Sequence, residues 1–140
     1  MSAPAYLTEL LKSLKIALTG TVLVDAVAVK YFTANVGNAS RGIFLTQYQE
    51  NGEDNKHKHS ATVFFTLQCF DKSDSVEAIV SISEQVKTIV KASVTSTIEL
   101  GGNLSATVTK SPIANLYQEQ NNGITTHRCD IRFELLIDEI

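Results

Sequence analysis

The chain has 140 residues, of which 44% are hydrophobic and 19% are charged. These values are typical of a globular protein, so neither disorder nor a fold that depends on disulfides is the default expectation. Twelve basic and fifteen acidic residues give a net charge of −3, which has the wrong sign for binding a nucleic-acid backbone. This length predicts a single domain over residues 1–140, with roughly two thirds of the unfolded chain's surface buried.

The N-terminal segment predicts an amphipathic helix. Over Ala5–Leu18 apolar residues recur at helical spacing, and Gly20 is placed to end the helix. The apolar stripe consists of Leu7, Leu10, Leu11, Leu14, Ala17 and Leu18. Because Glu9, Lys12 and Lys15 lie beside this stripe, the segment is neither a signal peptide nor a membrane span, and we expect no membrane association.

Strand and loop signals alternate in the next part of the chain. Val22–Val29 is β-branched and apolar, which favours a short strand. Thr33–Gly42 is rich in Asn, Gly and Ser and is expected to be a connecting loop. A short strand is then predicted over Ile43–Gln49, followed by a polar and charged loop over Glu50–His59.

The segment Ser60–Val90 predicts a strand joined to a helix. Its odd positions up to residue 69 are apolar, as expected for a strand with one buried face: Ala61, Val63, Phe65, Leu67 and Cys69. Asp71–Asp74 ends this strand and offers oxygens that can cap a helix. Apolar residues then follow at helical spacing: Val76, Ile79, Val80, Val86, Ile89 and Val90. The sequence therefore predicts a helix packed on a sheet.

The C-terminal part predicts strands and turns. The expected strands are Val94–Leu100, Leu104–Val108, Ile113–Gln118 and Thr125–Ile137, separated by the turn Gly101–Asn103, a bend at Pro112 and the turn Asn121–Gly123. In the last strand the odd positions are apolar and the even positions mostly polar. The order helix, strands, helix, strands predicts an α+β fold: two helices packed on a mainly antiparallel sheet, in a single two-layer domain.

Residues that could carry chemistry are sparse. His57 and His59 form the one local group of potential metal ligands, without a third ligand at suitable spacing. His127 shares the buried face of its strand and is expected to be a histidine at the edge of the core whose ring nitrogens have hydrogen-bond partners. We therefore predict no catalytic site, no metal and no cofactor; an enzyme built from residues dispersed in sequence stays as a minor alternative. Cys69 and Cys129 fall in step with the apolar positions of their strands and are predicted to be buried, reduced thiols.

Several large side chains are out of step with the predicted core. Phe64 and Phe70 lie on the opposite face from the apolar stripe of their strand, and Tyr48, Leu116 and Leu136 are similarly placed. A second apolar sheet face indicates a surface that another subunit covers. The alternative is that the second helix covers that face while the first packs elsewhere.

In the order, spacing and length of its elements the chain resembles the tail-completion family of long-tailed bacteriophages, also called tail terminator or neck proteins. The resemblance rests on the strand end Gln68–Asp71, the helix Val76–Val90 and the final strand His127–Ile137. It covers nearly the whole chain. Two positions depart from many relatives: Arg41–Phe44 stands where they have a proline-aromatic pair, and Phe70 where they have a tryptophan.

The resemblance implies a structural virion protein that forms a ring, usually of six subunits, at the head-proximal end of the tail. Such a ring stops growth of the tail tube and joins the tail to the head, after assembly in the host cytoplasm. Its partners would be the tail-tube protein and a head-completion or connector protein, and DNA would pass the channel without specific binding. The candidate interface residues are Glu50, Glu53, Asp54, Lys56, His57, Lys58, His59, Phe64, Phe70, Asn121 and Asn122.

Two other interpretations remain open. One is a cytosolic module, monomeric or dimeric, that binds a small partner through the sheet face or the long loops. The other is a different phage morphogenesis protein, such as a tail-tube subunit or a head-completion adaptor.

Overall fold

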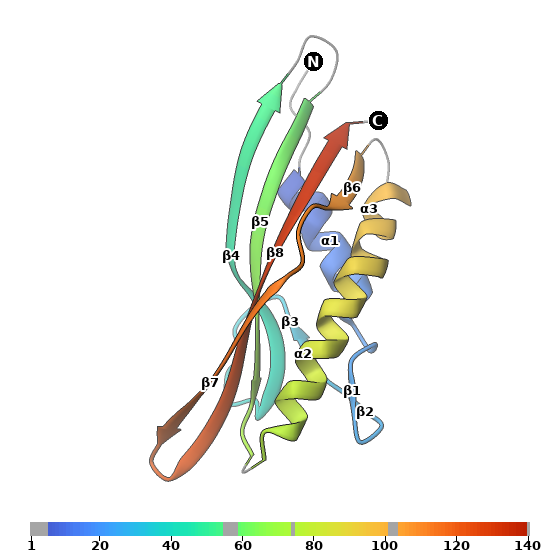
Figure 1. Ribbon diagram of the computed structural model, residues 1–140. Coiled ribbons are helices and arrows are strands. Elements are labelled where there is room, and N and C mark those ends of the chain that lie inside the picture. Colours follow the sequence, from blue (N-terminus) through green and yellow to red (C-terminus); the bar gives the residue numbers. More distant parts are fainter. Residues whose placement is uncertain (1–5, 55–58, 74, 101–103, 140) are drawn as a thin grey trace.

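The computed structural model of the chain describes residues 6–54, 59–73, 75–100 and 104–139. It has two layers, a strongly twisted sheet and a layer of helices on one side of it (Figure 1). One pair of strands is parallel and all other pairs are antiparallel. The predicted α+β class with a mainly antiparallel sheet is confirmed.

The main sheet is built around two long central strands. In the order β3-β4-β5-β8-β6 its strands are β3 (Tyr31–Phe32), β4 (Arg41–Asp54), β5 (His59–Asp71), β8 (Ile124–Glu139) and β6 (Leu104–Val108). Strand β7 (Ile113–Asn121) also pairs with β8. Strands β6 and β7 follow one another along the same side of β8, because β5 occupies the other side. Pro112 stands between them, as predicted.

The core lies between the sheet and the helices. Alternation along β5 and β8 sends one set of side chains inward, as the sequence predicts. Phe65 is 1% exposed and stacks on Phe133 of β8, with ring centroids 5.0 Å apart. Cys69 and Cys129 are buried free thiols, which agrees with the prediction, and they lie directly opposite one another in the β5–β8 register.

A β-bulge between Leu45 and Gln47 changes the faces of β4. Beyond this bulge Tyr48 pairs with Phe65 and packs against the core. The expectation that Tyr48 lies outside the core is therefore wrong. A bulge adds one unpaired residue and so inverts the inward and outward positions that follow it, which strict alternation cannot reveal.

Helix α1 (Tyr6–Leu18) forms where the sequence predicts it, and Gly20 follows it with φ +76°. Its buried stripe is nevertheless rotated from the predicted one. Leu7 and Leu11 are 39% and 42% exposed, whereas Tyr6 is buried in their place. The helix packs against the second helical segment, and this contact selects its Tyr6, Leu10 and Leu14 side.

The predicted strand Val22–Val29 is a two-stranded hairpin, which is a correction. Its strands are β1 (Leu23–Val24) and β2 (Val27–Ala28), separate from the main sheet. Asp25 and Ala26 form the turn, both with positive φ. Non-glycine residues rarely adopt this conformation, so the sequence carries no turn signal there. The amide of Gln85 holds this hairpin through the backbone N–H and C=O of Leu23, at 2.9 and 2.8 Å.

The predicted strand Val94–Leu100 is also wrong, because the second helix continues through it. Helix α2 (Glu77–Ile89) passes into a π-helical turn η1 (Val90–Val94) and then into α3 (Thr95–Leu100). Val86, Val90, Val94 and Ile98 form one buried stripe with a spacing of four residues. Their β-branched chemistry favours a strand locally, but burial of this stripe against the core overrides that preference.

An ion pair joins the first residue of β4 to the last residue of β5, next to the segment that leads into α2. The Nε atom of Arg41 lies 2.7 Å from Asp71 Oδ1, and Asp71 is 2% exposed. Ser73 donates a hydrogen bond from its hydroxyl to the other Asp71 oxygen at 2.5 Å. Ser75 then accepts a hydrogen bond from the N–H of Glu77 at 3.2 Å, but Val76 is the N-cap residue and no side chain caps the helix there. Of the predicted capping segment, Asp74 lies outside the described residues.

The predicted loop Glu50–His59 is largely strand, which is another correction. Strand β4 runs to Asp54 and β5 begins at His59, so the two form a long hairpin whose residues 55–58 lie outside the described part. Polar composition here marks solvent on an edge strand rather than a loop. The turn Asn121–Gly123 is confirmed, with φ +52° at Asn122 and +77° at Gly123. The predicted turn Gly101–Asn103 lies outside the described residues, and a helix rather than a strand precedes it.

Candidate subunit interface

The helices leave one face of the sheet bare. We call this side the outer face (Figure 1). The register places the even-numbered side chains of β5 and β8 on it, and it also receives Gln47 and Gln49 from β4 after the bulge. Long polar and aromatic side chains therefore cover a broad surface to which the described helices contribute nothing.

Phe70 lies on the outer face but is buried, so the expectation that it is an exposed interface residue is wrong. It is 3% exposed, with Phe32 and Phe44 at centroid distances of 6.3 and 6.0 Å and the Arg128 guanidinium 6.0 Å from its ring. Gly42 makes this close packing possible, because a Cβ there would clash with the Phe32 ring. A small aromatic cluster has formed where the sequence indicated a free apolar side chain.

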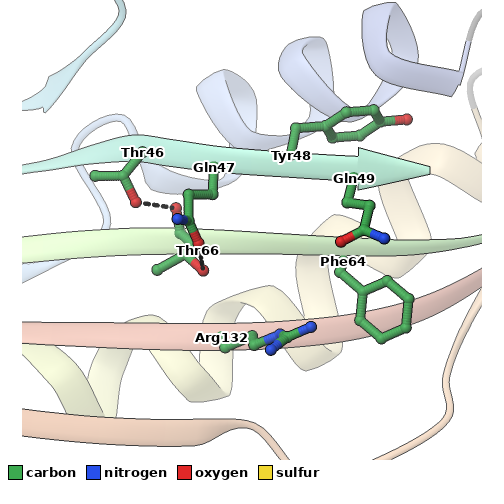
Figure 2. Close-up of a pocket in the computed structure, with 7 residues that line it drawn as sticks. All are labelled: Thr46, Gln47, Tyr48, Gln49, Phe64, Thr66 and Arg132. Atoms are coloured by element: carbon green, nitrogen blue, oxygen red, sulfur yellow. Dashed lines mark hydrogen bonds between the residues drawn. The ribbon is translucent and has the colours of Figure 1, made fainter.

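Phe64 is an aromatic residue of the outer face, and it is half-buried. The guanidinium of Arg132 lies 5.1 Å from the centroid of its ring, a cation–π arrangement. The two residues line an open cleft of about 530 Å³, shown in Figure 2, together with Thr46, Gln47, Tyr48, Gln49 and Thr66. No described acidic side chain forms an ion pair with Arg132, so its donors are available to a carboxylate or a carbonyl from outside.

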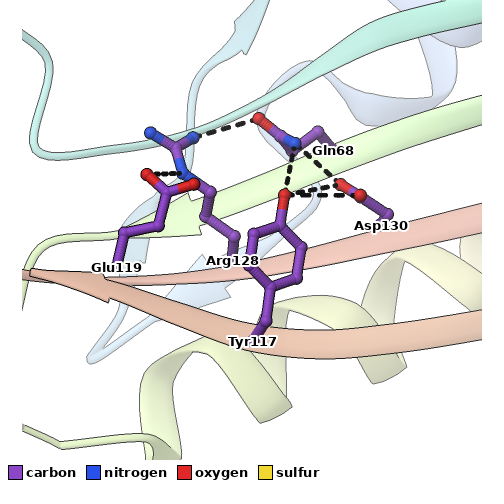
Figure 3. Close-up of polar contacts among 5 residues, drawn as sticks. All are labelled: Gln68, Tyr117, Glu119, Arg128 and Asp130. Atoms are coloured by element: carbon purple, nitrogen blue, oxygen red, sulfur yellow. Dashed lines mark hydrogen bonds and ion pairs between the residues drawn. The ribbon is translucent and has the colours of Figure 1, made fainter.

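A polar network lies further along the outer face, between β5, β8 and β7 (Figure 3). The Gln68 amide donates to Asp130 Oδ1 at 2.7 Å and to the Tyr117 hydroxyl at 3.0 Å. Arg128 donates to Gln68 Oε1 at 3.0 Å and lies 3.1 Å from the carboxylate of Glu119. Partial burial, and then the charge of Asp130, raise the pKa of Tyr117 above its ordinary value, so its phenol stays protonated as a donor. This network fixes β7 against the sheet.

The other described members of the predicted interface lie at the two ends of the sheet. Glu50 is exposed on β4 and accepts a hydrogen bond from the Tyr48 hydroxyl at 3.1 Å. Burial, and then the charge of Glu50, raise the pKa of Tyr48. Asn121 and Asn122 are exposed at the tip of the β7–β8 hairpin, far along the sheet from the β4–β5 hairpin (Figure 1).

Three other described members of the predicted set lie at the ends of β4 and β5 that form the β4–β5 hairpin. Glu53 and Asp54 end β4, and His59 begins β5. Lys56, His57 and Lys58 lie outside the described residues. The structure therefore separates the described members of the predicted set into two hairpins at opposite ends of the sheet and two phenylalanines of the outer face, of which Phe64 is half-buried and Phe70 is buried.

Among the described residues no three His, Cys, Asp or Glu side chains are grouped closely enough to hold a metal ion. His127 is buried, as predicted, with 6% of its surface exposed. Its Nε2 has no hydrogen-bond partner among the described residues, so the expectation that both ring nitrogens are partnered is wrong. No described helix is both long and apolar enough to span a membrane.

The residues that organise the outer face were not predicted from the sequence, namely Gln68, Tyr117, Arg128, Asp130 and Arg132. What could have indicated them is that every second position of β5 and β8 is mostly polar. Alternation alone does not show which strand lies beside which, so it could not bring Gln68 to Asp130 across more than sixty residues.

No protein-family model matches this chain. No curated protein matches its sequence either. In three dimensions the chain is similar to one chain of a solved structure titled "Virion of native gene transfer agent (GTA) particle". The TM-score is 0.49 with 11% sequence identity, and the match covers 96% of this chain and 87% of the other.

Proposed function

We propose that this chain is a structural protein of a phage tail that assembles as a ring, usually of six subunits, at the head-proximal end. In this proposal the ring ends tube growth, contacts the tail-tube protein below and a head-completion or connector protein above, and lets DNA pass without specific binding. The order of the elements supports it: an N-terminal helix, a long strand pair, a helix packed on the sheet and a final long strand.

The observation that carries the proposal is the outer face. It is a broad sheet surface without a covering layer, and it presents Phe64 under Arg132 beside an open cleft. Aromatic and arginine side chains are the residues most enriched at protein interfaces, and exposed apolar groups rimmed by polar ones mark such surfaces. The two hairpins extend beyond the helical layer at opposite ends, where they could reach the proteins above and below (Figure 1).

The cleft at Arg132 favours a second candidate, a module that binds a small partner. Its volume of about 530 Å³ is within the range of ligand sites, and its lining combines one cation, two aromatic residues, two amides and two threonine hydroxyls. A different phage morphogenesis protein, such as a tail-tube subunit or a head-completion adaptor, would use the same outer face.

The first test is the mass of the purified protein at micromolar concentration, followed by electron microscopy. We expect a closed ring, whereas a monomer at every concentration would support the small-partner module.

The second test replaces residues 55–58 with a Gly/Ser linker of equal length in the phage. We expect tails that assemble but fail to end or join heads, with the thermal midpoint of the purified variant within a few degrees of wild type, since these four residues are all polar and add no apolar side chain to the core. Normal tails would remove this hairpin tip from the interface.

A further inference from the structure

We propose that the free edge of β7 in one copy pairs with the free edge of β4 in another copy, so that the sheet continues between subunits. The inference deepens the proposed ring and rests on it. It identifies which parts of the molecule meet, which neither the resemblance nor the comparisons specify. Both edges belong to the same sheet, and each is open along most of its length.

Strand β7 is open along one whole side. Among the described strands it pairs with β8 alone, and all nine of its residues are exposed. Its turn is a two-residue hairpin closed by Asn121 and Ile124, and the residues that close such a hairpin exchange both backbone hydrogen bonds. Counting back in steps of two, the odd residues of β7 bond to β8. The N–H and C=O groups of Ala114, Leu116, Gln118 and Gln120 therefore point away from the sheet.

Strand β4 is open along its second half. Strand β3 pairs with it only at Ile43 and Phe44, and no other described strand pairs with the edge of β4 that faces away from β5. From Thr46 to Gly52 every side chain is exposed except Tyr48, which is half-buried. A row of backbone donors and acceptors is left without partners in the sheet, and such a row is a template for another strand.

Edge strands that must stay single usually carry protection, and β7 carries little. Lysine, proline and inward-pointing charges are the common devices. Strand β7 has no lysine and no proline, and its one charged residue, Glu119, already lies beside Arg128. It also exposes Ile113, Leu116 and Tyr117 by 62%, 49% and 37%. These features fit a strand that is covered in the assembly.

Strand direction makes the two edges of different copies compatible. Strands β4, β5, β8 and β7 alternate in direction, because each neighbouring pair is antiparallel. A second copy in the same orientation would therefore place its β4 antiparallel to β7 of the first. Because β7 is level with the first half of β4, the second copy must also be displaced along the strand direction to bring the open second half of its β4 beside β7. The contact joins two different patches, so it is heterologous and can build a ring. Odd residues of β7 and of β4 beyond the bulge share the outer face, so odd positions must meet odd positions.

The first experiment is cross-linking between two single variants. Asn115→Cys is mixed under a mild oxidant with Gln47→Cys, Gln49→Cys or Asn51→Cys, because directly opposed residues have Cβ atoms about 4.5–5.5 Å apart. We expect a disulfide-linked pair of chains with at least one partner, and none with the control Lys91→Cys, which is exposed on the helical layer. Rings that form without any of these cross-links would overturn the inference and leave the proposed ring intact.

The second experiment is Gln118→Pro, with Gln118→Ala as the matched control. Proline removes an N–H that points outward and spares the bonds from β7 to β8, so the monomer should fold. We expect at least a tenfold loss of self-association for the proline variant and none for alanine, with unchanged circular dichroism. If the folded Gln118→Pro protein assembles as well as the wild type, the edge pairing is contradicted. If the wild-type protein itself never assembles, the ring is contradicted. Should Gln118→Pro fail to fold, the cross-linking result decides.

Discussion

Phe64 and Phe65 are adjacent in sequence and have opposite surroundings. Phe65 is 1% exposed and stacked on Phe133, whereas Phe64 is half-buried on the outer face under Arg132. We expect Phe65→Ala to lower the free energy of unfolding by about 3–5 kcal/mol, because it leaves a cavity in the core. Phe64→Ala should cost clearly less, about 1 kcal/mol, since much of that ring already contacts water. Denaturant unfolding of both variants measures the difference, and equal losses would contradict the assignment of faces.

The two thiols predict a loss of stability in alkali. Burial raises the pKa of Cys69 and of Cys129 above the ordinary value of 9.0. The folded state then favours the protonated thiols more than the unfolded state does. This contribution is fully present below pH 9 and is lost as the pH rises through the folded pKa values. We expect the free energy of unfolding of the wild-type protein to fall above about pH 9. For Cys69→Ala, measured from its own value at neutral pH, the fall should be less steep. A slope unchanged in that variant would count against this origin.

At the scale of elements, the continuation of α2 through η1 into α3 makes a prediction that separates helix from strand. Ser96 is exposed in α3, and its hydroxyl donates to the carbonyl of Ala92 at 2.8 Å. Because alanine is the best helix former, Ser96→Ala should raise the free energy of unfolding by about 0.3–0.5 kcal/mol, and Ser96→Gly should lower it by about 0.5 kcal/mol. In a strand, alanine would instead be unfavourable. Thermal unfolding of the two variants is the measurement.

The β7–β8 turn depends on one glycine. Gly123 has φ +77°, a conformation that costs an L-residue roughly 1–2 kcal/mol. We expect Gly123→Ala to destabilise the protein by about 1 kcal/mol or more. Gly52→Ala is the control, because Gly52 has no positive φ and its nearest neighbour to a new Cβ is 4.0 Å away. Equal stability of the two variants would show that the turn is not held as described.

At the scale of the whole molecule, the way subunits associate should be visible in its response to salt. Backbone pairing between β7 and β4 involves no ion pairs, and the open β4 edge carries Glu50 rather than a cation. Because about 1 M salt reduces the Debye length to roughly 3 Å, it should weaken an ionic interface but leave an edge-paired assembly intact. Sedimentation in low and high salt measures this. Dissociation in high salt would indicate that charged residues such as Arg132 carry the contact.

The parts predicted from sequence and the parts missed differ for physical reasons. Alternation in β5 and β8 and helical spacing in α1 and α2 follow from burial, so the two layers and the strands β5 and β8 were predictable. The buried side of α1 and the length of β4 were not, because they depend on tertiary contacts. The Val94–Leu100 helix was missed because Val94 and Ile98 gain more from tertiary burial than local propensity suggests. Tyr48 was misplaced by a bulge, and Phe70 was hidden by Phe32 and Phe44, which approach it only in three dimensions. The outer-face network depends on strand order, which no local pattern encodes.

The unbroken β5–β8 ladder has a mechanical consequence. It runs from Ser60 paired with Asp138 to Asp71 paired with His127, without a register shift. Tension applied along the strands at the tips of the two hairpins would load these hydrogen bonds in shear, all at once, rather than opening them one after another. The β4–β5 hairpin lies at one end of this ladder and the β7–β8 hairpin at the other (Figure 1). The two central strands would therefore transmit tension between the proteins that the two hairpins contact.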